Sequence, residues 1–293
     1  MMQRVGSIAQ ARSLLAEPRL ARRTIGLVPT MGALHEGHLS LVRASRQRCD
    51  LTVVSVFVNP TQFGPEEDLA SYPRDLERDA ALLEAEGVDV LFAPSVEEMY
   101  PEGAETRVDP GPIANVLCGA SRPGHFIGVA TVVAKLFGIV SPDVAFFGEK
   151  DYQQLKVIER VVRDLDLPVE VVGCPIVRDG DGLALSSRNR YLTPGERARA
   201  VVLSRALLRV REQVGGGRTD AAALVDCLTD EISTEPGVRL EYAAVVDAES
   251  LAPVDIVARP CRALVAAQVG AARLIDNVAI GSAAEVAPRA IRA

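Results

Sequence analysis

The chain has 293 residues, of which 48% are hydrophobic, so it can bury a large core and belongs to neither the disordered nor the fibrous proteins. Its formal net charge of −7 offers no basic field for nucleic acid or an anionic membrane, and we expect neither partner. Because the N-terminus lacks a signal-peptide core and no apolar run reaches about 18 residues, we expect a cytoplasmic protein.

The first part of the chain alternates short apolar runs with segments of helical periodicity. The predicted strands are residues 24–29, 51–58, 88–92, 144–147 and 169–172, and the predicted helices are residues 37–48, 75–86, 126–140 and 151–165. Near-continuous apolar strands separated by helices favour an α/β fold with a doubly wound, Rossmann-like parallel sheet. Ligands of such sheets bind at the carboxyl ends of the strands.

The pattern changes after about Pro175. Two helical stretches, 194–214 and 219–233, precede predicted strands at 242–246, 262–269 and 273–280. This order is typical of a small α+β unit. We therefore divide the chain into a Rossmann-like ligand-binding domain, residues 1–176, and a smaller C-terminal α+β domain, residues 177–293, which we expect to act as a lid.

Two of the three histidines follow the first predicted strand, in the sequence PTMGALHEGH from Pro29 to His38. Glycines at a strand-to-helix turn let the backbone approach a phosphate, and the following helix offers free N–H groups. His35 and His38 share one helix face and could converge on one phosphoryl group. A zinc site of the H-E-x-x-H type is disfavoured because Leu39 stands where its second histidine would be.

Two later segments carry polar side chains to strand ends or to the domain junction. Lys150 and Asp151 follow the strand 144–147, where a cation opposes the helix dipole unless an anion compensates it. At the junction, the hydroxyls of Ser186 and Ser187 and the guanidinium of Arg188 suit triphosphate oxygens. A solvated helix-start lysine and an ordinary capping segment are the alternative interpretations of these two stretches.

Together these stretches resemble the pantothenate synthetase family, part of the nucleotidyltransferase and class I aminoacyl-tRNA synthetase-like superfamily. The resemblance spans about residues 24–280 and rests on PTMGALHEGH, FVNPTQF, SYPRD, GEKDYQQL, LALSSRNRYL and RLIDNVAI. One departure is Leu185, where family members commonly have methionine near the adenine. The resemblance implies an ATP-dependent condensation of (R)-pantoate with β-alanine to pantothenate, AMP and diphosphate, through a pantoyl adenylate.

The resemblance also implies the roles of individual residues. His35, His38 and Lys150 would be catalytic, Gln62, Gln154 and Asn59 would hold pantoate, and Asp79 is the candidate ligand of a Mg²⁺ ion that bridges phosphate oxygens. A homodimer is a further expectation of the family. The ATP-binding residues would be Pro29, Thr30, Met31, Gly32, His35, His38, Gly148, Lys150, Asp151, Val177, Leu185, Ser186, Ser187 and Arg188.

Two other functional classes stay open at this stage. A nucleotidyltransferase of the same fold could act on another acceptor, in which case Gln62 and Gln154 would have no acid to hold. A non-catalytic nucleotide-binding protein is disfavoured because every polar motif residue is present. A tRNA-handling role is disfavoured by the acidic charge balance.

Overall fold

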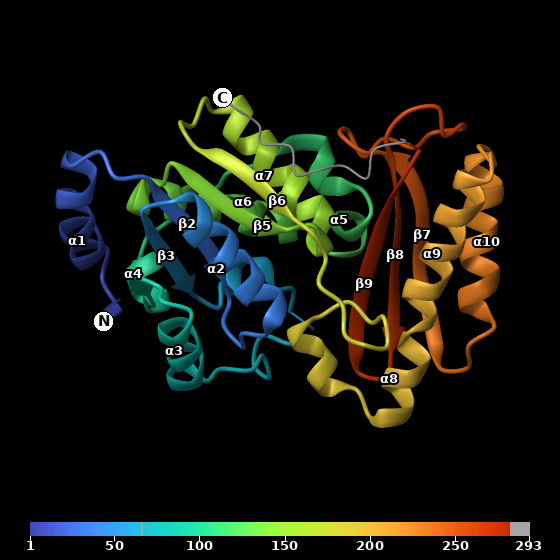
Figure 1. Cartoon of the computed structure of the whole chain (residues 1–293), viewed down its shortest axis with the longest axis horizontal. Helices are drawn as coiled ribbons and strands as arrows, with labels where there is room; N and C mark the ends of the chain where they lie inside the picture. Colours follow the sequence, from blue (N-terminus) through green and yellow to red (C-terminus); the bar gives the residue numbers. More distant parts are fainter. Residues whose placement is uncertain (66, 282–293) are drawn as a thin grey trace.

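The computed structural model describes residues 1–65 and 67–281 and shows two packed units side by side (Figure 1). The larger unit is built on a six-stranded sheet in the order β1-β4-β3-β2-β5-β6, in which all neighbours are parallel. Its strands are β1 Gln3–Val5, β2 Ile25–Thr30, β3 Leu51–Val56, β4 Val90–Phe92, β5 Val144–Gly148 and β6 Glu170–Cys174. The predicted doubly wound parallel sheet is confirmed.

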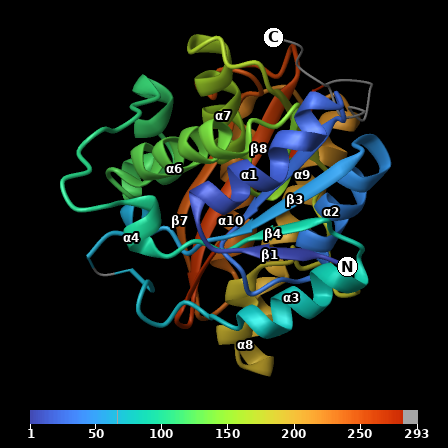
Figure 2. The same cartoon turned by 90° about the vertical axis from the view of Figure 1, so that its left-hand side faces the viewer.

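Helices cover both faces of this sheet, as Figure 2 shows for α6 and α3. Side chains of α1 (Ile8–Leu20), α6 (His125–Val140) and α7 (Tyr152–Asp164) form one core with the strands. On the opposite face the strands pack against α2 (Glu36–Arg48) and α3 (Leu76–Ala85). Successive strand residues alternate between these cores, as Val53 and Val54 do, and this explains why the strands are nearly continuous apolar runs.

Some elements of the larger unit do not follow from sequence patterns. Strand β1 has only three residues, and α1 has polar residues around its surface and Pro18 inside it. The remaining short helices are η1 Pro60–Gln62, α4 Val96–Met99, η2 Gly111–Asn115, α5 Cys118–Ser121 and η3 Glu149–Asp151. Across residues 1–65 and 67–281, none of the helices is both apolar enough and long enough for a membrane span.

The smaller unit is an antiparallel sheet of three strands with helices on one face. Its elements are η4 Ser187–Tyr191, α8 Pro194–Ala200, α9 Val202–Gly215, α10 Ala221–Ser233, β7 Val238–Asp247, β8 Cys261–Val269 and β9 Ala272–Ile280. The helix predicted over 194–214 is therefore two helices that meet at Val201. In β8, Ala263 and Val265 face α9 and α10, whereas Leu264 packs into the core of the larger unit.

The boundary at residues 176 and 177 stays a proposal, which the placement of the two cores supports. The parallel sheet ends at Cys174, and the core of the smaller unit begins in the chain at Leu183.

The strand order also indicates where a ligand would bind. From β2 the chain builds outward to β3 and β4, and β5 then returns to pair with the other edge of β2. Ligands of doubly wound sheets bind at such a reversal, outside the carboxyl ends of the strands.

Candidate active site

A cleft opens at this reversal, between the sheet and the second unit. It has two adjoining lobes of about 220 and 510 Å³, and Lys150, Gln154 and Arg188 line both of them. The predicted site residues that line the cleft are Pro29, Thr30, Met31, His35, His38, Asn59, Gln62, Gly148, Lys150, Asp151, Gln154, Val177, Leu185, Ser186, Ser187 and Arg188. Gly32 and Asp79 are not among its lining residues.

Asp79 holds the loop between β2 and α2 instead of facing the cleft. Its side chain is buried, and its two oxygens accept the backbone N–H groups of Ala33 and Leu34, each at 2.8 Å. Gly32 has a φ of 81°, and a Cβ there would lie 2.9 Å from the Asp79 carboxylate. The expected role of Asp79 as a Mg²⁺ ligand therefore lacks support, because both carboxylate oxygens already hold the loop.

The two histidine rings lie together at the start of α2. Their centroids are 4.1 Å apart, and Gly37 leaves room for the His35 ring, since a Cβ at that position would lie 3.0 Å from it. Nδ1 of His38 accepts the backbone N–H of His35 at 3.4 Å, which leaves the ring proton on Nε2. Nδ1 of His35 is buried without a hydrogen-bond partner among the described residues, so a ligand atom could satisfy it.

Both imidazoles are neutral at physiological pH. Burial and the positive charge of Lys150 lower the pKa of His35 to about 4. Burial and the neighbouring His35 lower the pKa of His38 to about 3. Each ring can therefore donate one N–H to an anion without carrying a charge of its own.

These pKa values predict how stability depends on pH. The unfolded chain binds histidine protons below about pH 6.5, whereas folded His38 does so only near pH 3. The free energy of unfolding should therefore have its full value above about pH 6.5 and should fall as the pH drops below it. Each histidine that binds a proton only in the unfolded chain lowers this free energy by up to about 1.4 kcal/mol per pH unit. Urea unfolding of wild type and His38→Asn between pH 4.5 and 7 should give a shallower slope for the variant. Equal slopes would contradict this assignment.

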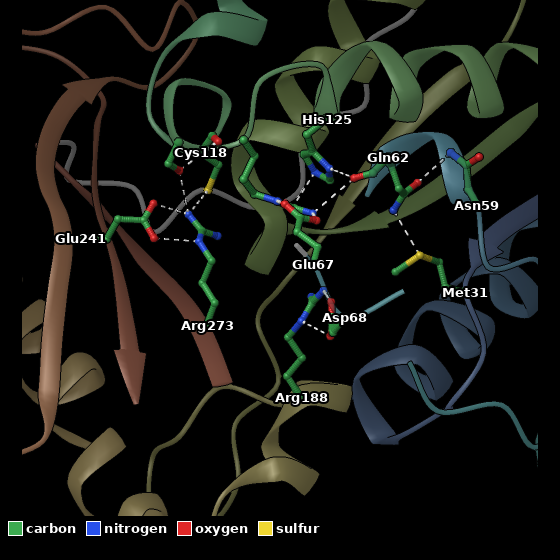
Figure 3. Close-up of polar contacts among 12 residues, drawn as sticks. Met31, Asn59, Gln62, Glu67, Asp68, Cys118, His125, Arg188, Glu241 and Arg273 are labelled. Atoms are coloured by element: carbon green, nitrogen blue, oxygen red, sulfur yellow. Dashed lines mark hydrogen bonds and ion pairs between the residues drawn. The ribbon is translucent and has the colours of Figure 1, made fainter. Parts of the chain in front are cut away.

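The carboxyl end of β3 supplies Asn59 and Gln62, and Figure 3 shows how they lie beside Met31 and His125. Asn59 Nδ2 donates to Gln62 Oε1 at 3.0 Å and to the Gly128 carbonyl at 3.1 Å. Asn59 Oδ1 accepts the Tyr100 hydroxyl at 2.9 Å. Since these bonds occupy Asn59, its geometry suits orienting Gln62 better than holding a substrate. Within residues 1–65 and 67–281, Gln62 Nε2 has only the Met31 sulfur, at 3.1 Å, as its partner and can turn to a ligand.

Gly128 of α6 is a close-approach position behind this turn. A Cβ at that residue would meet the carbonyl oxygen of Thr61 at 2.3 Å and the backbone nitrogen of Gln62 at 2.7 Å. Gly128→Ala should therefore push η1 away from α6 and cost about 1–3 kcal/mol of stability. Gly138→Ala on the same helix is the matched control, because a Cβ there meets nothing within 4 Å. Comparing the two variants by chemical denaturation tests this; equal stabilities would refute it.

An ion pair and a hydrogen bond join the second unit to the loop after η1. Arg188 donates to the Asp68 carboxylate from Nη2 at 2.8 Å and from Nε at 3.0 Å, and the Tyr72 hydroxyl lies 3.2 Å from Ser187 Oγ. Figure 3 shows the Arg188–Asp68 pair below Glu67. These contacts place the S-S-R-N segment beside the loop after η1, and the segment lines the cleft together with residues of β2 and β5.

Sequence reasoning missed His125 and Arg122, which also line the cleft. Nδ1 of His125 donates to the Gln62 carbonyl at 2.8 Å, and Nε2 lies 3.0 Å from Arg122 Nη1. Burial and Arg122 lower the pKa of His125 to about 4. The only signal in the sequence is the stretch Ser121–Phe126, in which an arginine and the third histidine flank a Pro-Gly pair.

A parallel sheet with a cleft at its strand reversal, lined by lysine, arginine and imidazole side chains, is typical of α/β enzymes that bind nucleotides or other phosphorylated ligands. Residues 3–279 match the family model described as pantoate–beta-alanine ligase. The chain therefore belongs to the pantoate–beta-alanine ligase family. It is a ligase, and the reaction of the family is the ligation of pantoate and β-alanine.

Sequence similarity to named relatives extends over nearly the whole chain. The pantothenate synthetase of Heliobacterium modesticaldum is 56% identical over 279 residues, which are 95% of this chain and 99% of the relative. A crystal structure of pantothenate synthetase from Thermus thermophilus has 54% identity and a TM-score of 0.90, over 94% of this chain and 99% of that one. The Francisella tularensis ligase, solved with beta-gamma ATP and β-alanine, has 36% identity and a TM-score of 0.79, over 95% and 97%.

Proposed function

We propose that the ligation proceeds through a pantoyl adenylate. The pantoate carboxylate attacks the α-phosphorus of ATP, and diphosphate leaves; the amine of β-alanine then attacks the acyl carbonyl, and AMP leaves. The observation that carries this proposal is the convergence of His35, His38, Lys150 and Arg188 on one cleft. The ATP form and β-alanine bound to the Francisella ligase support a nucleotide and an amine in the equivalent place here.

In the first step charge accumulates on phosphoryl oxygens, and the cleft offers fixed donors for it. Lys150 is the cation that most lowers the pKa of His35, and its side chain is only about one-fifth exposed. His38, neutral and protonated on Nε2, would donate to a phosphate oxygen rather than give up a proton. Ser186, Ser187 and Arg188 would hold the leaving diphosphate. Donors that need no rearrangement in a partly dry site give the largest stabilisation of such a transition state.

Pantoate would lie between the two glutamines. Gln62 Oε1 accepts from Asn59, but its Nε2 contacts only the Met31 sulfur among the described residues, and Gln154 lines both lobes of the cleft. The preceding Gln153 is buried and donates instead to the carbonyls of Ile113 and Val116. The paired glutamines of α7 thus divide into one that supports the fold and one that faces the substrate space.

Arg188 has to change partners when ATP binds. Asp68 now accepts hydrogen bonds from Nε and Nη2 of Arg188, and a triphosphate would compete for the same donors. We therefore infer that the second domain and the loop that carries Asp68 close on the nucleotide together, which would exclude water from the adenylate. Crystals grown with and without the adenylate would test this, since an unchanged spacing between the domains would contradict it.

Mg²⁺ enters the proposal as a companion of ATP. Each carboxylate that lines the cleft pairs with an arginine or lysine, and the described residues contain no cluster of three or more potential metal ligands. These carboxylates are Glu67, Asp68, Asp151 and Asp276. Mg²⁺ commonly keeps phosphate oxygens and water as most of its ligands, so this donor set fits an ion bound through the nucleotide. Bound in this way, the ion would neutralise phosphate charge.

Three further expectations belong to the same proposal. We infer a homodimer, a cytoplasmic location and no role in nucleic-acid binding. Sedimentation equilibrium would test the first, and it would fail if the protein stayed monomeric at micromolar concentration.

The decisive experiment is pantoate-dependent exchange between ATP and labelled diphosphate, with β-alanine omitted. Formation of an adenylate requires that exchange depend on pantoate and continue without the amine. Exchange that needs β-alanine, or that other acceptors support equally well, would overturn the proposal. Gln154→Ala should raise the KM for pantoate more than that for ATP, whereas equal changes would remove Gln154 from the acid site.

A further inference from the structure

Asn277 of β9 connects the second domain to the turn that carries Lys150. Its side chain is buried, and its Nδ2 donates to two successive carbonyls, Glu149 O at 3.0 Å and Lys150 O at 2.9 Å. Its Oδ1 accepts Arg262 Nε at 2.6 Å. One amide thus uses both its donors and its acceptor across the domain junction, a set of bonds that a carboxylate of the same shape cannot reproduce.

Arg262 of β8 holds the residues on either side of Lys150. Its Nη2 donates to Glu149 Oε2 at 2.7 Å, and its guanidinium carbon lies 4.1 Å from the centre of the Tyr152 ring. Lys150 itself lies in η3, a turn of three residues between β5 and α7. So short a 3₁₀ turn has few internal hydrogen bonds, and outside partners are needed to fix its peptide planes.

We propose that Asn277 is a positioning residue for Lys150. By binding the carbonyls of Glu149 and Lys150, it fixes the peptide planes around the Lys150 Cα and therefore the direction in which the ammonium enters the cleft. The second domain then contributes to the phosphate site twice, through Arg188 at its start and through Asn277 near its end. This inference rests on the proposed role of Lys150 at the nucleotide phosphates.

A double-mutant cycle tests whether Asn277 acts through Lys150. Asn277→Ser replaces the amide with a shorter hydroxyl, and Asn277→Asp keeps the shape without the two donors; each should lower kcat/KM for exchange by about 10²-fold, the scale of a misplacement near 1 Å. In a Lys150→Ala background the same substitutions should have little further effect. The same variants are also compared by their affinity for MgATP, measured by calorimetry. This second measurement detects the coupling between Asn277 and Lys150 even where exchange is too weak to measure.

Glu249→Gln is the matched control for a general loosening of the junction. It removes the ion pair from Lys156 Nζ to the Glu249 carboxylate, at 3.2 Å, lies outside both lobes of the cleft and leaves the contacts of Asn277 in place. We expect kcat/KM and the affinity for MgATP to stay within about twofold of wild type, because an ion pair with one exposed partner contributes little. Melting temperatures of all variants separate folding defects from misplacement.

Additive losses in the two backgrounds, or wild-type activity in Asn277→Asp, would overturn the inference. A wild-type protein without pantoate-dependent exchange would overturn the proposed function instead. The inference would then be decided by the calorimetric cycle alone, where coupling between Asn277 and Lys150 supports it and additivity refutes it.

Discussion

Replacing Lys150 with alanine is expected to lower kcat for pantoate-dependent exchange by about 10²–10³-fold, the range for removing one preorganised donor from a developing charge. Lys150 lines the cleft together with the histidine pair and Gln154, and its side chain is about one-fifth exposed, so solvent cannot replace the ammonium fully. Folding should be unaffected, since the ammonium has only Asp151, at 3.7 Å, as an ionic partner among the described residues. Steady-state exchange and thermal melting measure the two effects.

Lys135 offers the matched control for this experiment. The chain has three lysines, and Lys135 points its ammonium over the Tyr100 ring at 5.6 Å without lining either lobe of the cleft. Lys135→Ala should therefore keep exchange near the wild-type rate. If the two variants lost activity equally, the loss would reflect net charge and not the position of Lys150.

Replacing Asp79 with alanine is expected to reduce stability by about 2–4 kcal/mol and activity with it. Two buried amides, those of Ala33 and Leu34, would lose a charged acceptor at 2.8 Å each, and an unsatisfied buried donor costs about 1–3 kcal/mol. The loop between β2 and α2 would then lose the shape that presents His35 and His38. Urea denaturation and exchange activity should fall together.

Helix α3, which carries Asp79, provides a control that separates an effect on the loop between β2 and α2 from an effect on the helix itself. Asp75 caps α3 through one bond, to Arg78 N at 3.1 Å, on the exposed side, and Asp75→Ala should cost about 1 kcal/mol with little loss of exchange. If Asp79 were instead a metal ligand, Asp79→Ala would keep wild-type stability and raise the Mg²⁺ concentration needed for activity. That result would restore the expectation drawn from the sequence.

Local pattern was enough to predict much of the sheet, and most of the residues that the motifs singled out line one cleft. Apolar runs of four to eight residues reported the buried strands, because a strand covered on both faces has to be apolar at every position. The polar motifs follow these runs directly, as His35 and His38 follow β2 and Lys150 follows β5. Since parallel strands end at one edge, motifs far apart in the chain could be expected to meet.

Patterns failed where an element depends on distant partners. Three residues are too few to show a period, so β1 exists because Gln3–Val5 can pair with β4 at residues 90–92. For the same reason the sequence did not predict the break between α8 and α9 at Val201. It also did not predict that Asp79 and Asn59 form their hydrogen bonds with other parts of the protein. A carboxylate or amide in the sequence does not reveal whether its hydrogen bonds go to a ligand or to the backbone.

The sequence by itself determined the layered α/β architecture, the strand ends that carry polar residues and, through its motifs, the family. Only the tertiary structure decided that the histidines are neutral, that Arg188 rests on Asp68, and that Asn277 holds the turn of Lys150. The physical reason is how far along the chain the residues that determine each property lie. Periodicity records whether a residue is buried, which neighbours in sequence already imply, whereas charge state and hydrogen-bond partners depend on atoms that folding brings from remote parts of the chain.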